Sequence, residues 1–196
     1  MKRFLLLAAV VFGVWMCARP APAGYWSGRP GTEPLQTTGS FPAAWTREGF
    51  TYQPLARFAV KAVVLSRERY RNDPGAKLAP VDLALGWGAM SDAAVINALH
   101  ISQDHRWYNY SWTGNPPIDP SEIGRSSANM HMIPASPAVR AALLEVKRHE
   151  LVELSGYLVE IRRADGWHWR SSTSREDTGG GACEVVWVEA LTHRPL

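Results

Sequence analysis

The amino-acid sequence predicts one α+β domain in which an antiparallel, partly closed β-sheet carries two helices. Two patterns predict this fold class. Aromatic and β-branched runs recur between clusters of Gly, Pro, Asn and Asp, which is typical of strands joined by turns. Two other segments repeat their apolar residues with helical spacing. About 170 residues follow the N-terminal leader described next, which is enough for one domain with a substantial core.

The first 49 residues are predicted to lie outside the domain. Lys2 and Arg3 precede an apolar run at 4–18 and the small-residue stretch APAG, so we expect a signal peptide over 1–23 that is cleaved before Gly24. An uncleaved anchor in the inner membrane is the alternative, although the run is shorter than the about 20 residues that span a bilayer. The Gly- and Pro-rich segment 24–49 is predicted to be a linker or an irregular wrapping segment, and 50–196 the domain.

The first half of the domain is predicted to contain two strands and a helix. The segment 57–69 is rich in Val and Ala and has charges mainly at its ends, so we expect a strand covered on both faces. A short strand at 81–88 ends in two glycines, where the chain turns or another segment comes close. Ser91 or Asp92 can then cap a short helix that reaches Leu99.

The second half begins with an aromatic strand at 105–112, followed by the segment 113–124, whose three prolines and two glycines predict irregular structure. Residues 126–133 are predicted to be another strand. The best helix starts at the N-cap Ser136 and ends with the basic residues 147–149. Three strands in an antiparallel meander complete the domain, at 151–161, 167–172 and 182–191.

Charge and cysteine content exclude some classes of protein. Loss of Lys2, Arg3 and Arg19 with the leader lowers the count of Lys and Arg from 21 to 18, which equals the 18 Asp and Glu. A neutral mature chain lacks the positive footprint of a nucleic-acid-binding protein, so we predict no nucleic-acid partner. Cys183 is then the single cysteine, which excludes an internal disulfide and favours a buried, inert thiol.

The tripeptide Asp177-Thr178-Gly179 is the sequence that carries the catalytic aspartate of aspartic proteases. In those enzymes it follows an apolar strand, whereas here Ser174, Arg175 and Glu176 precede it and glycines follow it. This composition favours a solvated hairpin turn in which Asp177 bonds its own backbone. A polar site at the mouth of a sheet, built from Arg175 and Asp177, is the second reading.

No metal site or cofactor is predicted. His149 and Glu150 begin a sequence similar to a zinc-protease motif, but Glu153 stands where the second histidine ligand is required. His100, Asp104 and His105 carry side chains that bind metals, yet no helix aligns them and no further ligand is identifiable.

Six residues are candidates for a binding site. Trp167 and Trp169 are two apart on a predicted strand, so both project from one face, where they either stack on a ligand or belong to the core. Asn129 and His131 share a face of the strand 126–133 in the same way. Together with Arg175 and Asp177 they are the polar groups from which a site is most readily assembled.

Three blocks of sequence resemble those of an uncharacterised family of small exported bacterial proteins: DLALGWGAMSD at 82–92, SANMHMIPA at 127–135, and a long block at 156–191 that contains GWHWRSSTSREDTGGGACEVVWVE. The resemblance implies export and no particular activity. The segment LVELSGYLVEI at 151–161 is also similar to the opening strand of oligonucleotide- and oligosaccharide-binding (OB) barrels, which implies an OB-like sheet.

These observations predict an exported periplasmic or membrane-tethered module that binds or assembles with an envelope protein or a glycan. The competing hypothesis is an envelope hydrolase whose polar site is drawn from Asn129, His131, Arg175 and Asp177, which requires these side chains to converge in one pocket.

Overall fold

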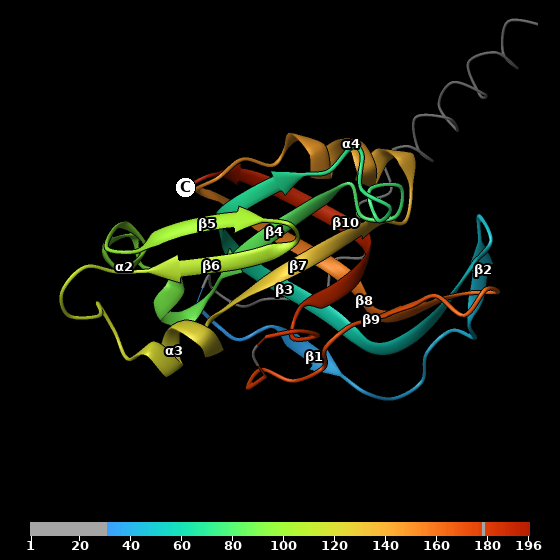
Figure 1. The fold of residues 1–196 in the computed structure, drawn as a ribbon, viewed down its shortest axis with the longest axis horizontal. Coiled ribbons are helices and arrows are strands. Elements are labelled where there is room, and N and C mark those ends of the chain that lie inside the picture. The colour runs from blue at the N-terminus through green and yellow to red at the C-terminus, as the bar shows by residue number, and fades with distance from the viewer. Residues whose placement is uncertain (1–30, 178) are drawn as a thin grey trace, which may run out of the picture.

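The computed structural model describes residues 31–177 and 179–196. The expected leader, its cleavage site and the first residues of the expected linker lie outside this range. Strand makes up 48% of the chain and helix 15%, so the protein is β-rich. Figure 1 shows the elements, which are, in chain order, β1 (Leu35–Thr37), β2 (Trp45–Arg47), β3 (Phe50–Arg69), β4 (Val81–Gly86), the 3₁₀ turn η1 (Gly88–Ser91), α2 (Ala93–Asn97), β5 (His100–Asp104), β6 (Trp107–Ser111), α3 (Pro120–Arg125), β7 (Ser127–Pro134), α4 (Pro137–Glu145), β8 (Glu150–Arg163), β9 (His168–Arg170) and β10 (Glu184–Pro195).

Five strands form the body of a mixed, mostly antiparallel sheet. Hydrogen-bonded pairs link β3 to β4, β4 to β7, β7 to β10, β10 to β8, and β8 back to β3. The β7–β10 pair runs parallel and the other four run antiparallel. Each of the five strands therefore has a partner along both edges for at least part of its length.

Within the five-stranded body, the long strand β3 pairs first with β8 and then with β4. Its first part, from Phe50 to Val63, pairs with β8, and its last part, from Val63 to Arg69, pairs with β4. Register shifts after Pro54 and Val64 bend the strand between these partners, as bulges do. Pro54 lacks an N–H for the ladder, which explains why it stands at a bulge.

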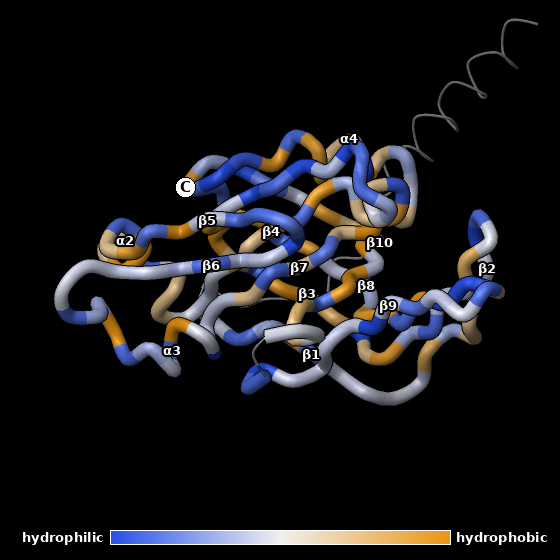
Figure 2. Tube along the Cα trace, in the orientation of Figure 1, coloured by the Kyte–Doolittle hydropathy of each residue, from blue (hydrophilic) through white to orange (hydrophobic). Residues whose placement is uncertain are grey.

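The main core lies between the five strands and α4. Leu143 and Val146 at the C-terminal end of α4 belong to the same buried cluster as Phe58, Leu83 and Met132 of the sheet. Figure 2 shows apolar residues along the crossing strands and hydrophilic residues along the β8–β9 turn. Two smaller clusters cover the outer faces: one under η1, α2 and the β5–β6 hairpin, and one under β2 and β9.

The hairpin of β5 and β6 is inserted between β4 and β7 and lies over the sheet in Figure 1. Its two-residue turn consists of His105 and Arg106, both of which have positive φ angles, 50° and 67°. This is the backbone of a type I′ turn, which matches the twist of a hairpin. On the inward face, Tyr108 and Tyr110 pack against the cluster under α2.

Several predictions about single elements are confirmed. Strands form at the predicted positions around 57–69, 81–86 and 127–134, and Asp92 caps α2 by accepting a hydrogen bond from the N–H of Ala94 at 2.7 Å. The close approach expected at the end of the second strand is present, because a Cβ on Gly86 would lie 2.3 Å from the main-chain oxygen of Met90.

Other predictions are wrong. There are three α-helices rather than two among the described residues, because α3 forms in the segment predicted to be irregular. Asp119 caps α3, Pro120 occupies its first turn, and Ile123 buries against the cluster under α2. The predicted C-terminal meander is also wrong, because β8 lies between β9 and β10.

The helix predicted to run into residues 147–149 ends at Glu145. Arg67 and Arg69 of β3 donate to the carbonyls of Val146 and Leu144, at 2.6 and 3.0 Å. These side chains satisfy carbonyls that would otherwise continue the helix. The segment expected to be a linker also contributes to the sheet, since β1 and β2 both pair with β3. Trp45 of this segment stacks on Tyr52, with ring centroids 5.7 Å apart.

Candidate functional site

A pocket of about 310 Å³ lies where the loop between β9 and β10 separates from the sheet. One wall is β6, from Trp107 to Tyr110, and the opposite wall is formed by residues 174, 175, 177, 179 and 182–184 of the loop and the start of β10. The start of β7, at Ser127 to Asn129, makes the floor, because β10 begins to pair with β7 only at Met130. The volume is at the lower end of the range of small-ligand sites.

An ion pair between Arg175 and Glu184 stands at this pocket. Nη1 of Arg175 lies 2.5 Å from Oε1 of Glu184, which is 1% exposed, and the guanidinium is over the ring of Trp87. Burial raises the pKa of Glu184 to about 7, although the charge of Arg175 acts in the opposite direction. Oε2 of Glu184 and Nη2 of Arg175 are buried without a hydrogen-bond partner. Such unpaired groups are costly in a folded protein and are a common feature of functional sites.

Glu184 is expected to make stability depend on pH. Its pKa is higher in the folded protein than its ordinary value of 4.5, so the folded state binds the proton more tightly. The resulting stabilisation is present below about pH 4.5 and is lost as the pH rises through about 7. Over this window we expect wild type to lose roughly 3 kcal/mol relative to Glu184→Gln, in which the group does not titrate. Urea unfolding of both proteins across the window measures the difference, and parallel stability curves would contradict it.

Asn129 and Cys183 meet on the floor of the pocket. The amide nitrogen Nδ2 of Asn129 donates to the carbonyl of Arg106 at 2.9 Å and lies 3.8 Å from Sγ of Cys183. Its Oδ1 accepts a hydrogen bond from Nε2 of Gln103 at 2.7 Å. Asn129 therefore joins β7 to the inserted hairpin, and its side chain is already engaged on both sides.

Cys183 is expected to alkylate slowly. Cys183 is half-buried at the pocket rather than fully buried, and burial raises the pKa of its thiol to about 11. At about pH 8 the thiolate fraction is roughly a hundredfold below that of an exposed cysteine, and the thiolate is the reactive species. Iodoacetamide labelling should accordingly be about a hundredfold faster in the denatured chain. Equal labelling rates in the folded and denatured protein would contradict this environment for Cys183.

Asp177 lies exposed in the loop between β9 and β10, and it bonds a serine side chain rather than its own backbone. Its Oδ2 accepts a hydrogen bond from the hydroxyl of Ser172 at 2.6 Å, and the residue itself is exposed. Thr178 lies outside the described residues. The burial that an aspartic protease needs around its carboxylate is absent at Asp177.

His131 does not line the pocket. It is 4% exposed, and its Nδ1 lies 2.8 Å from Oδ2 of Asp82, with the geometry of an ion-pair contact rather than of a directed hydrogen bond. Its ring also contacts that of Trp169, with centroids 4.7 Å apart. The four polar residues proposed for a hydrolase therefore converge only in part: Asn129, Arg175 and Asp177 line one pocket, and His131 is buried beside it.

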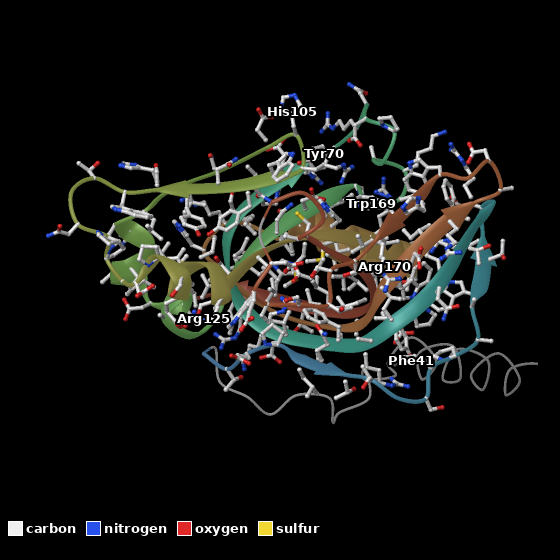
Figure 3. All side chains as sticks on the ribbon, turned by 60° about the horizontal axis from the view of Figure 1, so that its bottom comes forward. Phe41, Tyr70, His105, Arg125, Trp169 and Arg170 are labelled. Atoms are coloured by element: carbon white, nitrogen blue, oxygen red, sulfur yellow. The ribbon has the colours of Figure 1, made fainter. Side chains whose placement is uncertain are left out.

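Arg106, at the hairpin turn, connects the elements around His131. Its guanidinium donates to Asp82 at 3.0 Å, to Asp73 at 2.8 Å and to the carbonyl of Ala79 at 3.1 Å. The same group stacks on Tyr70, 4.0 Å from the ring centroid. In Figure 3, Tyr70 lies beneath the turn that carries the exposed His105, and Trp169 lies further toward the centre of the molecule. These contacts hold the hairpin in place as one wall of the pocket.

Trp167 and Trp169 project from one face of the β9 region, as predicted, but both are half-buried. They pack against the cluster under β2, and their ring centroids are 6.3 Å apart. Trp167 also lines a second, shallower hollow of about 290 Å³ with Glu160, Arg162 and His168. The two indoles thus pack as part of the core and do not form an exposed platform for stacking on a ligand.

Sequence reasoning missed Asp82, Arg106 and Glu184 as site residues. Asp82 and Glu184 were both readable as acidic residues within apolar strands, because a buried carboxylate requires a partner. No comparable signal marks Arg106, since its role depends on an unpredicted hairpin turn. Within the residues that the structure describes, no three His, Cys, Asp or Glu side chains are placed to hold a metal ion.

Comparisons with protein families, with characterised proteins and with solved structures found no match to this chain. In the described part of the chain, none of the helices is both long and apolar enough to cross a bilayer.

Proposed function

We propose that the protein is an exported binding module, without enzymatic activity, that carries its ligand in the pocket between β6 and the loop 174–184. It acts in the periplasm, or at the inner membrane if the leader is retained, and takes an envelope protein or a glycan as its partner. The proposal rests on the position of the pocket, which lies beside the start of β7 and between β6 and the loop before β10.

The sheet type that we propose is a partly closed, OB-like sheet. Three features support it: the cycle of five pairings, the parallel β7–β10 pair, and the helix α4 between the third and fourth of the five strands. OB barrels bind their ligands on the face of their second and third strands, between the first and last connecting loops. In chain order the five strands are β3, β4, β7, β8 and β10. The third strand is therefore β7, and the last connection is the one between β8 and β10. Residues of both line the pocket.

Charge in the pocket favours a ligand other than nucleic acid. Arg175 is its single cationic side chain and is already paired with Glu184, while Asp177 adds a second carboxylate. A nucleic-acid site instead needs several cations free to meet phosphates.

The hydrolase hypothesis is less well supported. Asn129, Arg175 and Asp177 favour it because they share the pocket, but the only histidine in the set faces Asp82 and Trp169. A general base must reach its substrate within hydrogen-bonding distance, directly or through one water. Hydrolysis of an envelope glycan that is lost in His131→Asn would favour the enzyme over the binding module.

The test is a ligand titration followed by NMR on the full-length protein, expressed with its own leader and purified as the cell processes it. Tri-N-acetylchitotriose serves as the glycan probe and a selected peptide, described below, as the protein probe. We expect at least one probe to shift the amide signals of Asn129 and Cys183 while His168, at the second hollow, stays unchanged. If neither probe shifts the pocket signals, the pocket is not the binding site.

A further inference from the structure

The free edge of β6 and the pocket beside it identify the class of ligand. Among the described residues, β6 pairs only with β5, so its other edge has no strand partner. Side chains on adjacent strand residues point to opposite faces, yet the pocket contacts four consecutive residues of β6, Trp107 to Tyr110. The pocket therefore runs along the edge of the strand rather than over one of its faces.

The turn of the hairpin determines which main-chain groups point into this edge. In a type I′ turn the carbonyl of Asp104 accepts from the N–H of Trp107, so these residues form a hydrogen-bonded pair. Pairs alternate along an antiparallel ladder, which makes Ser102–Asn109 hydrogen-bonded and Gln103–Tyr108 not. The N–H and C=O groups of Tyr108 and Tyr110 consequently point away from β5. No other main-chain group in the described residues bonds to them outside the hairpin.

The edge of β6 lacks the features that protect strand edges. Its sequence, WYNYS, has no charge and no proline, and its register with β5 has no bulge. The edge strands of the main sheet are protected: β1 and β2 have three residues each, and β9 carries His168 and Arg170. An uncharged, regular edge is a template for another strand, and natural proteins leave one open where a strand is to be added.

We propose that this edge binds an extended segment of a partner protein, which adds to β6 as a strand and lies in the pocket. The inference rests on the proposed function and gives its ligand class. Outward N–H and C=O groups at the spacing of a β-ladder match a peptide and not a sugar. Trp107, at the start of β6, is 48% exposed and offers an apolar contact to a side chain of the segment.

The opposite wall leaves room for the main chain of such a segment and favours a positive charge on it. Gly179, in the loop, has open space where a Cβ would stand, so a peptide can approach its backbone closely. With Glu184 ionised, Arg175, Asp177 and Glu184 give the pocket a net charge of −1. The partner segment is therefore expected to carry a Lys or Arg near the strand that it adds.

The probe is the most enriched peptide from a phage-displayed library of random nonapeptides, selected on the full-length protein and then synthesised. Amide hydrogen exchange of the free and the peptide-saturated protein is followed by NMR. The N–H groups of Tyr108 and Tyr110 should exchange about tenfold more slowly in the complex, because they gain hydrogen bonds. The N–H of Asn109, already bonded within the hairpin, is the internal control and should change little.

Two variants of Tyr110 distinguish the contribution of its main-chain N–H to peptide binding from that of its ring. Tyr110→Pro removes the outward N–H, which an edge strand tolerates, whereas Tyr110→Ala removes the ring and keeps the N–H. We expect the proline variant to bind the peptide about tenfold more weakly than the alanine variant. The wild-type exchange measurement gives the same information if the proline variant does not fold.

Equal affinity of the two variants, unchanged exchange at both tyrosines, or a selection that enriches no peptide would each overturn the strand-addition proposal. If chitotriose nevertheless shifts the signals of Asn129 and Cys183, the binding-module function stands and only the peptide ligand fails. If no probe shifts them, both proposals fail.

Discussion

Replacing Arg106 by Asn is expected to lower the free energy of unfolding by about 3–5 kcal/mol, the cost of breaking a buried ion pair by removing one partner. Asp82 is fully buried and is paired with Arg106 and His131. The variant therefore leaves a carboxylate in the sheet with its cationic partner gone. Asn tolerates the positive φ of this position, so the change removes the guanidinium without new backbone strain.

The hairpin should loosen in the same variant. Asp73 and the carbonyl of Ala79 lose their hydrogen bonds from Arg106, and Tyr70 loses its stacked guanidinium. Because the hairpin is one wall of the pocket, we also expect the selected peptide to bind more weakly. Urea unfolding measures the stability, and the matched control is Arg125→Ala, which breaks the surface pair with Glu122 and should cost at most about 1 kcal/mol. Similar losses in the two variants would show that Arg106 does not anchor the hairpin.

Gly156→Ala is expected to destabilise the protein by at least about 3 kcal/mol or to prevent folding. A Cβ at this position would lie 1.9 Å from the main-chain oxygen of Trp187, and that atom belongs to β10, which pairs with β8 along this segment. The clash cannot be relieved by a side-chain rotation, so the two strands must separate. Since Gly156 also pairs with Phe58 of β3, the separation disturbs the centre of the sheet.

Gly180→Ala is the matched control for this change. No atom lies within 4 Å of the Cβ that it would add, and Gly180 is exposed in the loop opposite β6. Its thermal stability should stay close to that of wild type. If Gly156→Ala melted at the same temperature as Gly180→Ala, the close approach of β10 to Gly156 of β8 would be contradicted.

The local sequence pattern predicts those strands and helix ends that depend only on neighbouring residues. The sequence predicts the apolar strand before Arg69 and the N-caps Asp92 and Ser136, since apolar runs and caps depend on neighbouring residues. The close approach at Gly86 was readable for the same reason. The predicted polar face of β7 is not exposed, because Asn129 and His131 are buried like Met130. The prolines at 116–120 predict irregular structure, but Pro120 occupies the first turn of α3, where proline is favoured, so the helix forms after it.

The order of the strands in the sheet could not be predicted from the local sequence. The three C-terminal strands look like a meander, but β10 passes over to β7 and leaves β9 at the edge, because burial of Val186 and Val188 among the residues of β7 and β8 outweighs pairing with the nearest strand in sequence. Strand pairing is decided by which apolar faces meet, and that depends on residues far apart in the chain.

The sequence by itself determined that this chain is β-rich, where its longest helix begins, and that Asp177 belongs to a polar, exposed loop. Only the tertiary structure decided which polar residues share a site. It brings Arg175 beside Glu184, encloses His131 against Asp82 and Trp169, and sets the edge of β6 against the loop 174–184. The physical reason is that caps, turns and alternation are short-range effects, whereas burial, ion pairing and a free strand edge arise from contacts between segments that the sequence keeps far apart.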